Sequence, residues 1–195
     1  MIHEIASEKY ESRKKNVLIE ELVKQYLEYS NVNKRYKSYL SNITSANALL
    51  KFFKGKRLNE IHPFMVERYK KERLKSVKPA SVNRDLACLK HMFSMAIVWN
   101  FAEGNPTKKV KLLKEEQRDV KVLTREKEKE LLDALGIHHN SRHVKDIVIT
   151  ALNTGMRQME IFCLLKESVD FKNRMIHVTH TKNWEIRDIP MNKLY

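Results

Sequence analysis

Apolar residues recur every three to four positions through the first half of the chain, which is the spacing of one face of an α-helix. This spacing predicts four helices. Asn16 can cap the first, and the second covers residues 35–54 and ends at Gly55. The third begins at Pro63 and reaches about residue 75, and the fourth covers residues 81–99. The positions expected to face inward are Ile19, Leu22, Val23, Tyr26 and Leu27 in the first helix, Tyr36, Tyr39, Leu40, Ile43, Asn47, Leu50 and Phe53 in the second, and Val82, Leu86, Leu89, Phe93 and Ala96 in the fourth.

The second half of the chain predicts three more helices and then three short strands. Thr124 caps a helix that Gly136 closes, the next helix stops at Gly155, and the third runs from Arg157 to about Lys166. Beyond it the apolar period changes from 3.6 to 2, which is typical of strands. The positions expected to face inward are Leu131, Leu132, Leu135, Val144, Ile147, Val148 and Ala151 in the helices, and Val169, Phe171, Met175, Ile176, Val178, Ile186 and Ile189 in the strands. The sequence therefore predicts a mainly α-helical protein with a small antiparallel β-sheet.

These elements divide the chain into four regions. Residues 1–16 are charged and without periodicity, so they form an N-terminal arm, and residues 17–106 form a helical domain that ends at an Asn-Pro pair. Residues 107–122 are charged and show no apolar period, which predicts an extended, solvated linker. This linker could lie along a phosphate backbone or be a plain tether. Residues 123–195 form the second domain.

Positive charge is concentrated in the first domain. The 195 residues carry a net charge of +14, and residues 1–115 hold 24 basic against 12 acidic residues, whereas residues 116–195 hold 14 against 12. This asymmetry is typical of a domain that binds a polyanion, although a lysine-rich soluble surface would give the same count. Helix starts favour phosphate. The candidate contacts are Lys34, Arg35 and Lys37 at the start of the second helix, and Ser81, Asn83, Arg84 and Lys90 on the fourth.

Other classes of site are disfavoured. The sequence has no apolar stretch long enough to span a membrane and no signal peptide. Cys88 and Cys163 are far apart and have no ligand-spaced neighbours, so we expect two reduced thiols in a cytoplasmic protein. His138, His139 and His143 include a pair with zinc-ligand spacing, but a solvated loop after Gly136 is the favoured interpretation. We therefore predict no metal and no cofactor.

The most informative segment is Thr-Ala-Leu-Asn-Thr-Gly-Met-Arg-Gln-Met-Glu-Ile, at residues 150–161. Gly155 interrupts the helical pattern and places Arg157 at the start of the next helix. Glu160 lies three residues further on, on the same helical face, where it can hold the arginine. This segment resembles the tyrosine recombinase (phage integrase) family, whose members share a Thr-Gly-Met-Arg-x-x-Glu-Ile core.

The resemblance extends over residues 117–195 and, less specifically, over 17–106. Residues 164–170 are similar to the family's step into its β-sheet, residues 180–183 to the hairpin turn that carries a catalytic lysine, and residues 187–191 to the return strand. Asn-Arg-Asp-Leu at 83–86 resembles the opening of the last helix of the core-binding domain. The resemblance implies a four-helix, SAM-like core-binding domain followed by the α+β start of a catalytic domain, ending before the His-x-x-Arg motif and the tyrosine nucleophile.

In this family the complete protein recombines or integrates DNA at specific sites through a 3′-phosphotyrosine intermediate. The resemblance assigns Arg157 to the scissile phosphate, Lys182 to protonation of the leaving oxygen, and Glu160 to support of Arg157. A solvated turn is the alternative for Lys182. Tyr195 follows the third strand directly and does not match the nucleophile, so the chain alone is predicted to be inactive.

The partner implied by the resemblance is duplex DNA, on which the protein could form dimers or tetramers, and neither a membrane nor a small-molecule substrate is expected. The protein would act in the cytoplasm, associated with the nucleoid, and be encoded by a bacterium or a phage. The alternative is a non-catalytic DNA-binding protein, or a natural truncation that occupies recombination sites. A helical protein-interaction module fits the charge asymmetry poorly.

Overall fold

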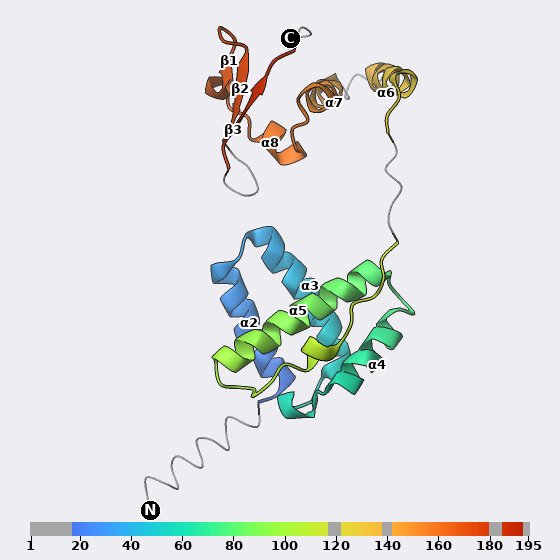
Figure 1. Ribbon diagram of the computed structural model, residues 1–195, viewed down its shortest axis with the longest axis vertical. Helices are drawn as coiled ribbons and strands as arrows, with labels where there is room; N and C mark the ends of the chain where they lie inside the picture. Colours follow the sequence, from blue (N-terminus) through green and yellow to red (C-terminus); the bar gives the residue numbers. More distant parts are fainter. Residues whose placement is uncertain (1–16, 117–121, 138–141, 180–184, 193–195) are drawn as a thin grey trace, which may run out of the picture. The chain divides into compact units, whose positions relative to one another are not determined.

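The computed structural model describes residues 17–116, 122–137, 142–179 and 185–192, and the chain divides into two compact units at residues 118 and 119 (Figure 1). Each unit is described by itself. The predicted arm over residues 1–16, with its capping residue Asn16, lies outside the described residues. The described parts confirm the predicted fold class, a mainly helical chain with one small antiparallel sheet.

Local sequence signals explain most helix boundaries in the first unit. Its elements are α2 (Ile19–Asn33), α3 (Tyr36–Phe53), η1 (Leu58–Glu60), α4 (Pro63–Arg73), α5 (Pro79–Val98) and η2 (Pro106–Lys109). Gly55 has φ +76°, so it reverses the chain after α3 as predicted. Pro63 opens α4, and Pro79 opens α5 two residues before the predicted start at Ser81, because a proline suits the first helical position. Asn100, at φ 57°, follows the end of α5.

Helices α2, α3 and α5 pack against one another and enclose the core of the first unit. The predicted inward positions of α2 and α5 are confirmed, since all are buried or, for Leu27, packed against the core. The face predicted for α3 is confirmed at Phe53, which is buried, and at Leu50, which packs against the core, and it is wrong at three other positions. Its buried residues are Ser45, Ala46, Leu49 and Phe53, whereas Tyr36, Leu40 and Asn47 are exposed. Small side chains allow close helix packing, so α3 buries them and turns two bulkier residues outward.

The segment predicted as a solvated linker packs instead on the first unit as far as residue 115. The Asn83 side chain clamps Leu113: its Oδ1 accepts the Leu113 N–H at 2.8 Å, and its Nδ2 donates to the Leu113 carbonyl at 2.9 Å and to Glu115 Oε1 at 2.6 Å. Lys70 Nζ donates to the Lys111 carbonyl at 2.7 Å. Val110 and Leu113 also pack against the core. The apolar contacts of Val110 and Leu113 and the hydrogen bonds of the buried Asn83 amide therefore hold this segment on the first unit, although its composition is polar.

The second unit combines three helices with the sheet. Its elements are α6 (Arg125–Ile137), α7 (Arg142–Thr154), α8 (Gln158–Phe162), η4 (Lys166–Ser168), β1 (Val169–Asp170), β2 (Met175–Val178) and β3 (Arg187–Pro190). The strands are antiparallel in the order β1-β2-β3, and Ile176 of β2 pairs with Val169 of β1 and Ile189 of β3. The Thr124 hydroxyl accepts the Lys127 N–H at 3.4 Å, in agreement with the predicted cap.

Several details of the second unit differ from the sequence-based prediction. Helix α6 continues through Gly136, and α8 ends at Phe162 rather than near Lys166. Phe171 and Ile186 lie outside the strands and are exposed, and Leu131 and Val144 are also exposed. Among the described residues of this unit, the buried apolar ones are Met156, Ile176 and Val178, with Ile161, Leu164, Ile189 and Met191 packed against them. This cluster joins the start of α8 to the sheet.

Candidate active site

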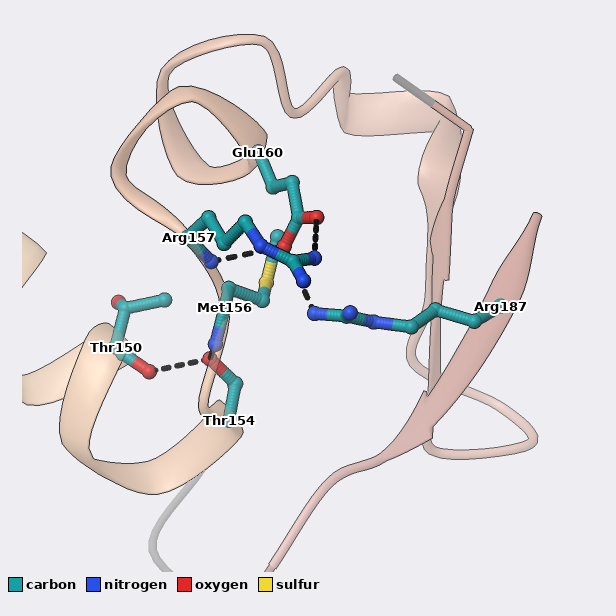
Figure 2. Close-up of polar contacts among 6 residues, drawn as sticks. All are labelled: Thr150, Thr154, Met156, Arg157, Glu160 and Arg187. Carbon is teal, nitrogen blue, oxygen red and sulfur yellow. Dashed lines mark hydrogen bonds and ion pairs between the residues drawn. The ribbon is translucent and has the colours of Figure 1, made fainter. Parts of the chain in front are cut away.

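The turn between α7 and α8 positions the candidate arginine. The Thr154 hydroxyl donates to the Thr150 carbonyl at 2.6 Å and accepts the Met156 N–H at 3.2 Å (Figure 2). Gly155 has φ +63°, a left-handed conformation that residues with a Cβ rarely adopt. Met156 then enters the buried cluster, and Arg157 becomes the N-cap of α8. The Thr-Gly-Met-Arg run thus reverses the chain, anchors it and presents the arginine.

Glu160 holds Arg157 from both its backbone and its side chain, as the spacing predicted. Glu160 Oε2 accepts the Arg157 backbone N–H at 2.8 Å, and Glu160 Oε1 accepts from Arg157 Nη1 at 2.9 Å. The Glu160 side chain is only 2% exposed, whereas that of Arg157 is 63% exposed. A buried carboxylate therefore orients a guanidinium that remains open to solvent.

Arg187 is a second cation at this carboxylate, and the sequence-based reading did not single it out. From β3, its Nη2 contacts Glu160 Oε2 at 2.8 Å (Figure 2). It lies 27 residues from Glu160 in the sequence. A buried carboxylate needs charge compensation, but no sequence spacing indicates which residue of another element supplies it.

The two arginines determine the charge state of Glu160. Burial alone would raise the pKa of the Glu160 carboxyl, because it disfavours the charged form. The hydrogen bonds from Arg157 and the positive charges of Arg187 and Arg157 outweigh burial, and the pKa lies below its ordinary value. Glu160 is therefore an anion at neutral pH, and it acts as an acceptor for both arginines.

Several other candidate residues of the second unit lie outside the residues that the structure describes. Lys182, with the rest of its predicted turn, lies outside the described residues, as do His138, His139 and Tyr195. Within the described parts of the chain no group of three or more metal-ligating side chains occurs, and no helix is long and apolar enough to cross a membrane. Cys88 and Cys163 are free, as predicted, and burial raises the pKa of the Cys88 thiol to about 11.

Two of the predicted phosphate contacts in the first unit are engaged within the protein. Lys34 Nζ donates to the Tyr26 hydroxyl at 2.9 Å and lies 3.5 Å from His91 Nδ1. Burial lowers the pKa of Lys34. Asn83 is buried, and its amide is used to clamp Leu113. The geometry therefore disfavours both residues as phosphate contacts and gives each a structural role.

The remaining basic candidates are exposed. Arg35 and Lys37 are exposed at the start of α3, Arg84 and Lys90 are exposed on α5, and Ser81 is half-buried near the start of α5. Helix α3 also exposes a polar face that the sequence reading missed, because it placed Asn47 inward. The members of this α3 polar face, spaced three or four residues apart, are Lys37, Ser41, Thr44, Asn47 and Lys51.

Comparison with known proteins identifies relatives over most of the chain. The phage integrase family matches residues 121–194, which include the whole Arg157–Glu160 segment. The shufflon-specific DNA recombinase of Escherichia coli is 30% identical over 168 residues, which are 84% of this chain and 41% of that protein. The integrase of Escherichia phage P2 is 35% identical over 122 residues, which are 62% of this chain and 34% of that protein. The chain therefore spans less than half the length of either relative.

Solved structures share the fold. The Tn1549 transposon integrase in complex with a circular intermediate DNA has a TM-score of 0.75 at 20% identity, over 90% of this chain and 62% of that one. A lambda integrase dimer bound to a COC′ core site has a TM-score of 0.81 at 15% identity, over 95% of this chain and 51% of that one. The proteins that match this chain are integrases and recombinases. The chain itself contains a helical first unit, a small sheet and the Arg157–Glu160 turn. We conclude that residues 121–194 match the phage integrase family and that the chain resembles a DNA recombinase and an integrase over most of its length.

Proposed function

We propose that this chain supplies the DNA-binding unit and part of the catalytic site of a site-specific tyrosine recombinase. The observation that carries the proposal is the Arg157 guanidinium, which is oriented by a buried carboxylate and yet exposed. A guanidinium held in this way can donate two parallel hydrogen bonds to a phosphate and cannot lose its charge at physiological pH. The relatives, an integrase and a DNA recombinase, support the same activity.

The proposed reaction breaks and rejoins a DNA strand. A tyrosine oxygen attacks the scissile phosphorus, the bond from phosphorus to the 5′ oxygen breaks, and a 3′-phosphotyrosine forms. Negative charge increases on the non-bridging oxygens during the attack, and Arg157 stabilises it. Lys182 donates the proton that the departing 5′ oxygen needs. Glu160 supports Arg157 and does not contact the DNA.

The first unit supplies the contacts to duplex DNA in this proposal. Its exposed basic residues on α3 and α5 contact phosphates, with Lys37, Arg84 and Lys90 as the principal candidates. The α3 polar face carries hydroxyl and amide groups between two lysines, which are suited to phosphate and base-edge hydrogen bonds. The lambda integrase relative is a dimer on its DNA site. We propose that this protein also assembles as dimers or tetramers on DNA, in the cytoplasm.

A salt titration tests the binding part of the proposal. The 195-residue chain should bind duplex DNA with an affinity that falls steeply as salt rises, because each neutralised phosphate adds about 0.9 to the log–log slope. The measurement is fluorescence anisotropy with a labelled duplex at several salt concentrations. A flat slope would contradict the proposed DNA contacts of the first unit.

A nicked suicide substrate tests the catalytic part. The full-length protein that contains this sequence should form a covalent DNA adduct, visible by denaturing electrophoresis, and Arg157→Ala should abolish it. A protein that binds DNA only to occupy sites would give the same salt slope but no adduct. We expect no adduct from the 195-residue chain, and an adduct lost in Tyr195→Phe would assign the nucleophile to Tyr195 instead.

A further inference from the structure

We propose that Arg187 is a positioning residue that acts through Glu160 to fix the guanidinium of Arg157, an inference that rests on the proposed function. The two oxygens of Glu160 accept three hydrogen bonds (Figure 2). Oε1 accepts from Arg157 Nη1, and Oε2 accepts from both the Arg157 backbone N–H and Arg187 Nη2. Arg157 alone engages both oxygens, so the bond from Arg187 is a third contact, and it ties the carboxylate to another element, β3. With it, the carboxylate cannot rotate without also losing its contact to the sheet, and Arg157 is held in one orientation.

Arg187 can perform this role because its own backbone is anchored. It lies on β3 opposite Val178 of β2, and Val178 belongs to the buried cluster of the second unit. Met156, which precedes Arg157, belongs to the same cluster. The sheet and the start of α8 already share a core. The Arg187–Glu160 ion pair links the same two segments. Such support from anchored neighbours keeps a catalytic group within the narrow range of productive geometry.

The three side chains also have a charge balance suited to a phosphodiester. Arg157 and Glu160 alone would form a neutral pair, which would weaken the attraction of Arg157 for an anion. With Arg187 the cluster carries one surplus positive charge, equal and opposite to the charge of one phosphodiester group. The charge is accessible, because the side chain of Arg157 is 63% exposed and that of Arg187 is 38% exposed, against 2% for Glu160.

A second Arg-x-x-Glu segment in the same chain shows what Arg187 adds. At the start of η1, Glu60 Oε2 accepts the Arg57 backbone N–H at 2.8 Å, and the Glu60 N–H donates to the Arg57 carbonyl at 3.0 Å. The same two backbone contacts occur between Arg157 and Glu160. Glu60 is exposed, however, and its segment is an ordinary helix start. Burial of the carboxylate and a second arginine therefore distinguish the candidate site from a local capping arrangement.

The first experiment measures the ionisation of Glu160 in the 195-residue chain by carboxyl carbon-13 NMR. Removal of the Arg187 charge by Arg187→Gln should raise the midpoint of the Glu160 titration, because one of the charges that lower the pKa is lost. Arg174→Gln is the matched control. It removes an equal charge from the turn before β2, where Arg174 Nη2 donates to the Asn192 carbonyl at 2.6 Å. An unchanged Glu160 midpoint in Arg187→Gln would overturn the proposal.

The second experiment measures single-turnover cleavage by the full-length protein that contains this sequence. Arg187→Gln should slow cleavage roughly 10- to 100-fold, since small misplacements of a catalytic group cost about this much. Its DNA affinity should stay within a few-fold of wild type, and the acidic limb of its pH–rate profile should move to higher pH with the Glu160 midpoint. Arg187→Lys keeps the charge and should recover part of the rate. Arg174→Gln should cleave like wild type.

Parallel measurement of Arg157→Ala separates the two proposals. If Arg157→Ala cleaves normally, the proposed function is wrong. If Arg157→Ala is inactive while Arg187→Gln cleaves like wild type, only the inference about Arg187 is wrong. A slow Arg187→Gln protein whose pH profile and Glu160 midpoint do not move would show a general structural defect, which also contradicts the positioning role. Thermal unfolding of each variant reports any such defect directly.

Discussion

The two units of the chain are stabilised in different ways. Among the described residues, the first unit buries a continuous cluster of 19 apolar residues, including Tyr26, Phe53 and Phe93, whereas the cluster of the second unit contains only Met156, Ile176 and Val178. Burial of a large apolar side chain contributes about 1.5–3 kcal/mol. The first unit therefore has a large core of its own, and the described apolar core of the second unit is much smaller.

The surfaces of the two units support the same distinction. The second unit exposes many large apolar side chains for its size: Leu123, Leu131, Val144, Leu152, Met159, Phe162, Leu165, Phe171 and Ile186. Large exposed apolar surfaces usually mark sites that other protein segments cover. The described residues of the second unit therefore leave much of their apolar surface exposed.

Each unit nevertheless contains a buried carboxylate to which two residues donate hydrogen bonds. The two sites differ in how far the bound arginine is exposed to solvent. In the first unit Asp85 Oδ2 accepts from the Tyr69 hydroxyl at 2.7 Å and from Arg73 Nε at 3.1 Å. The Arg73 side chain is 28% exposed, less than half the exposure of Arg157. The same arrangement ties helices together in the first unit and presents a cation to solvent in the second. Exposure of the cation, rather than the ion pair itself, marks the candidate site.

The largest expected effect separates these two arginines. Arg157→Ala should reduce cleavage by the full-length protein by at least ~10²–10³-fold, the usual effect of losing one preorganised donor, with little change in thermal stability. Arg73→Ala should do the reverse, lowering the stability of the first unit by about 1–3 kcal/mol because the buried Asp85 loses a partner. Cleavage and thermal unfolding are measured on both variants. If Arg73→Ala abolishes cleavage without unfolding the first unit, the distinction between the two carboxylate sites fails.

The next effect tests the stabilising role of the first unit's core. Leu89 is fully buried in α5, so Leu89→Ala should lower the free energy of unfolding of the first unit by about 2–5 kcal/mol. Leu165→Ala is the control in the second unit, where the side chain is exposed, and it should change stability by about 0.5 kcal/mol or less. Urea unfolding followed by circular dichroism measures both. An effect of Leu89→Ala as small as that of Leu165→Ala would show that the buried cluster does not stabilise the first unit.

A smaller effect is expected at the segment that packs on the first unit. Asn83→Ala removes the side-chain bonds to Leu113 and should cost about 1–3 kcal/mol. It should also increase hydrogen exchange at the Leu113 amide, which mass spectrometry of peptides covering residues 107–116 can follow. Asn47→Ala, at an exposed position of α3, is the control and should leave exchange unchanged. If Asn83→Ala does not alter exchange at Leu113, the clamp is not what holds this segment.

The smallest expected effect is the response of the Arg157–Glu160 contact to low pH. The pKa of Glu160 is lowered in the folded protein, so its ionised form contributes stability that is present above the ordinary glutamate pKa and is lost as pH falls through the lower folded value. The amide NMR signals of Arg157 and Glu160 should therefore keep their neutral-pH positions below the ordinary pKa of 4.5 and shift only at lower pH. Arg187→Gln should move this shift to higher pH. A shift already complete at the ordinary value would show that the arginines do not stabilise the anion.

Part of this protein is determined by its sequence alone. Helix ends at Gly55 and Gly155, helix starts at Pro63 and Thr124, and the Arg157–Glu160 contact all arise from residues within four positions of each other. Backbone sterics, capping and helical spacing act over that range, so a short window of sequence contains the necessary information. The change of apolar period from 3.6 to 2 likewise predicts the sheet from local pattern.

Only the tertiary structure decided the rest. The inward face of α3 depends on which side chains let neighbouring helices approach. The small residues Ser45 and Ala46 are buried there, whereas the bulky Tyr36 is exposed. Asn83 meets Leu113 across 30 residues, and Arg187 meets Glu160 across 27. Such contacts form when folding closes a long loop and buries a polar group that must then find a partner. The identity of that partner depends on the packing of whole elements, which no local pattern contains.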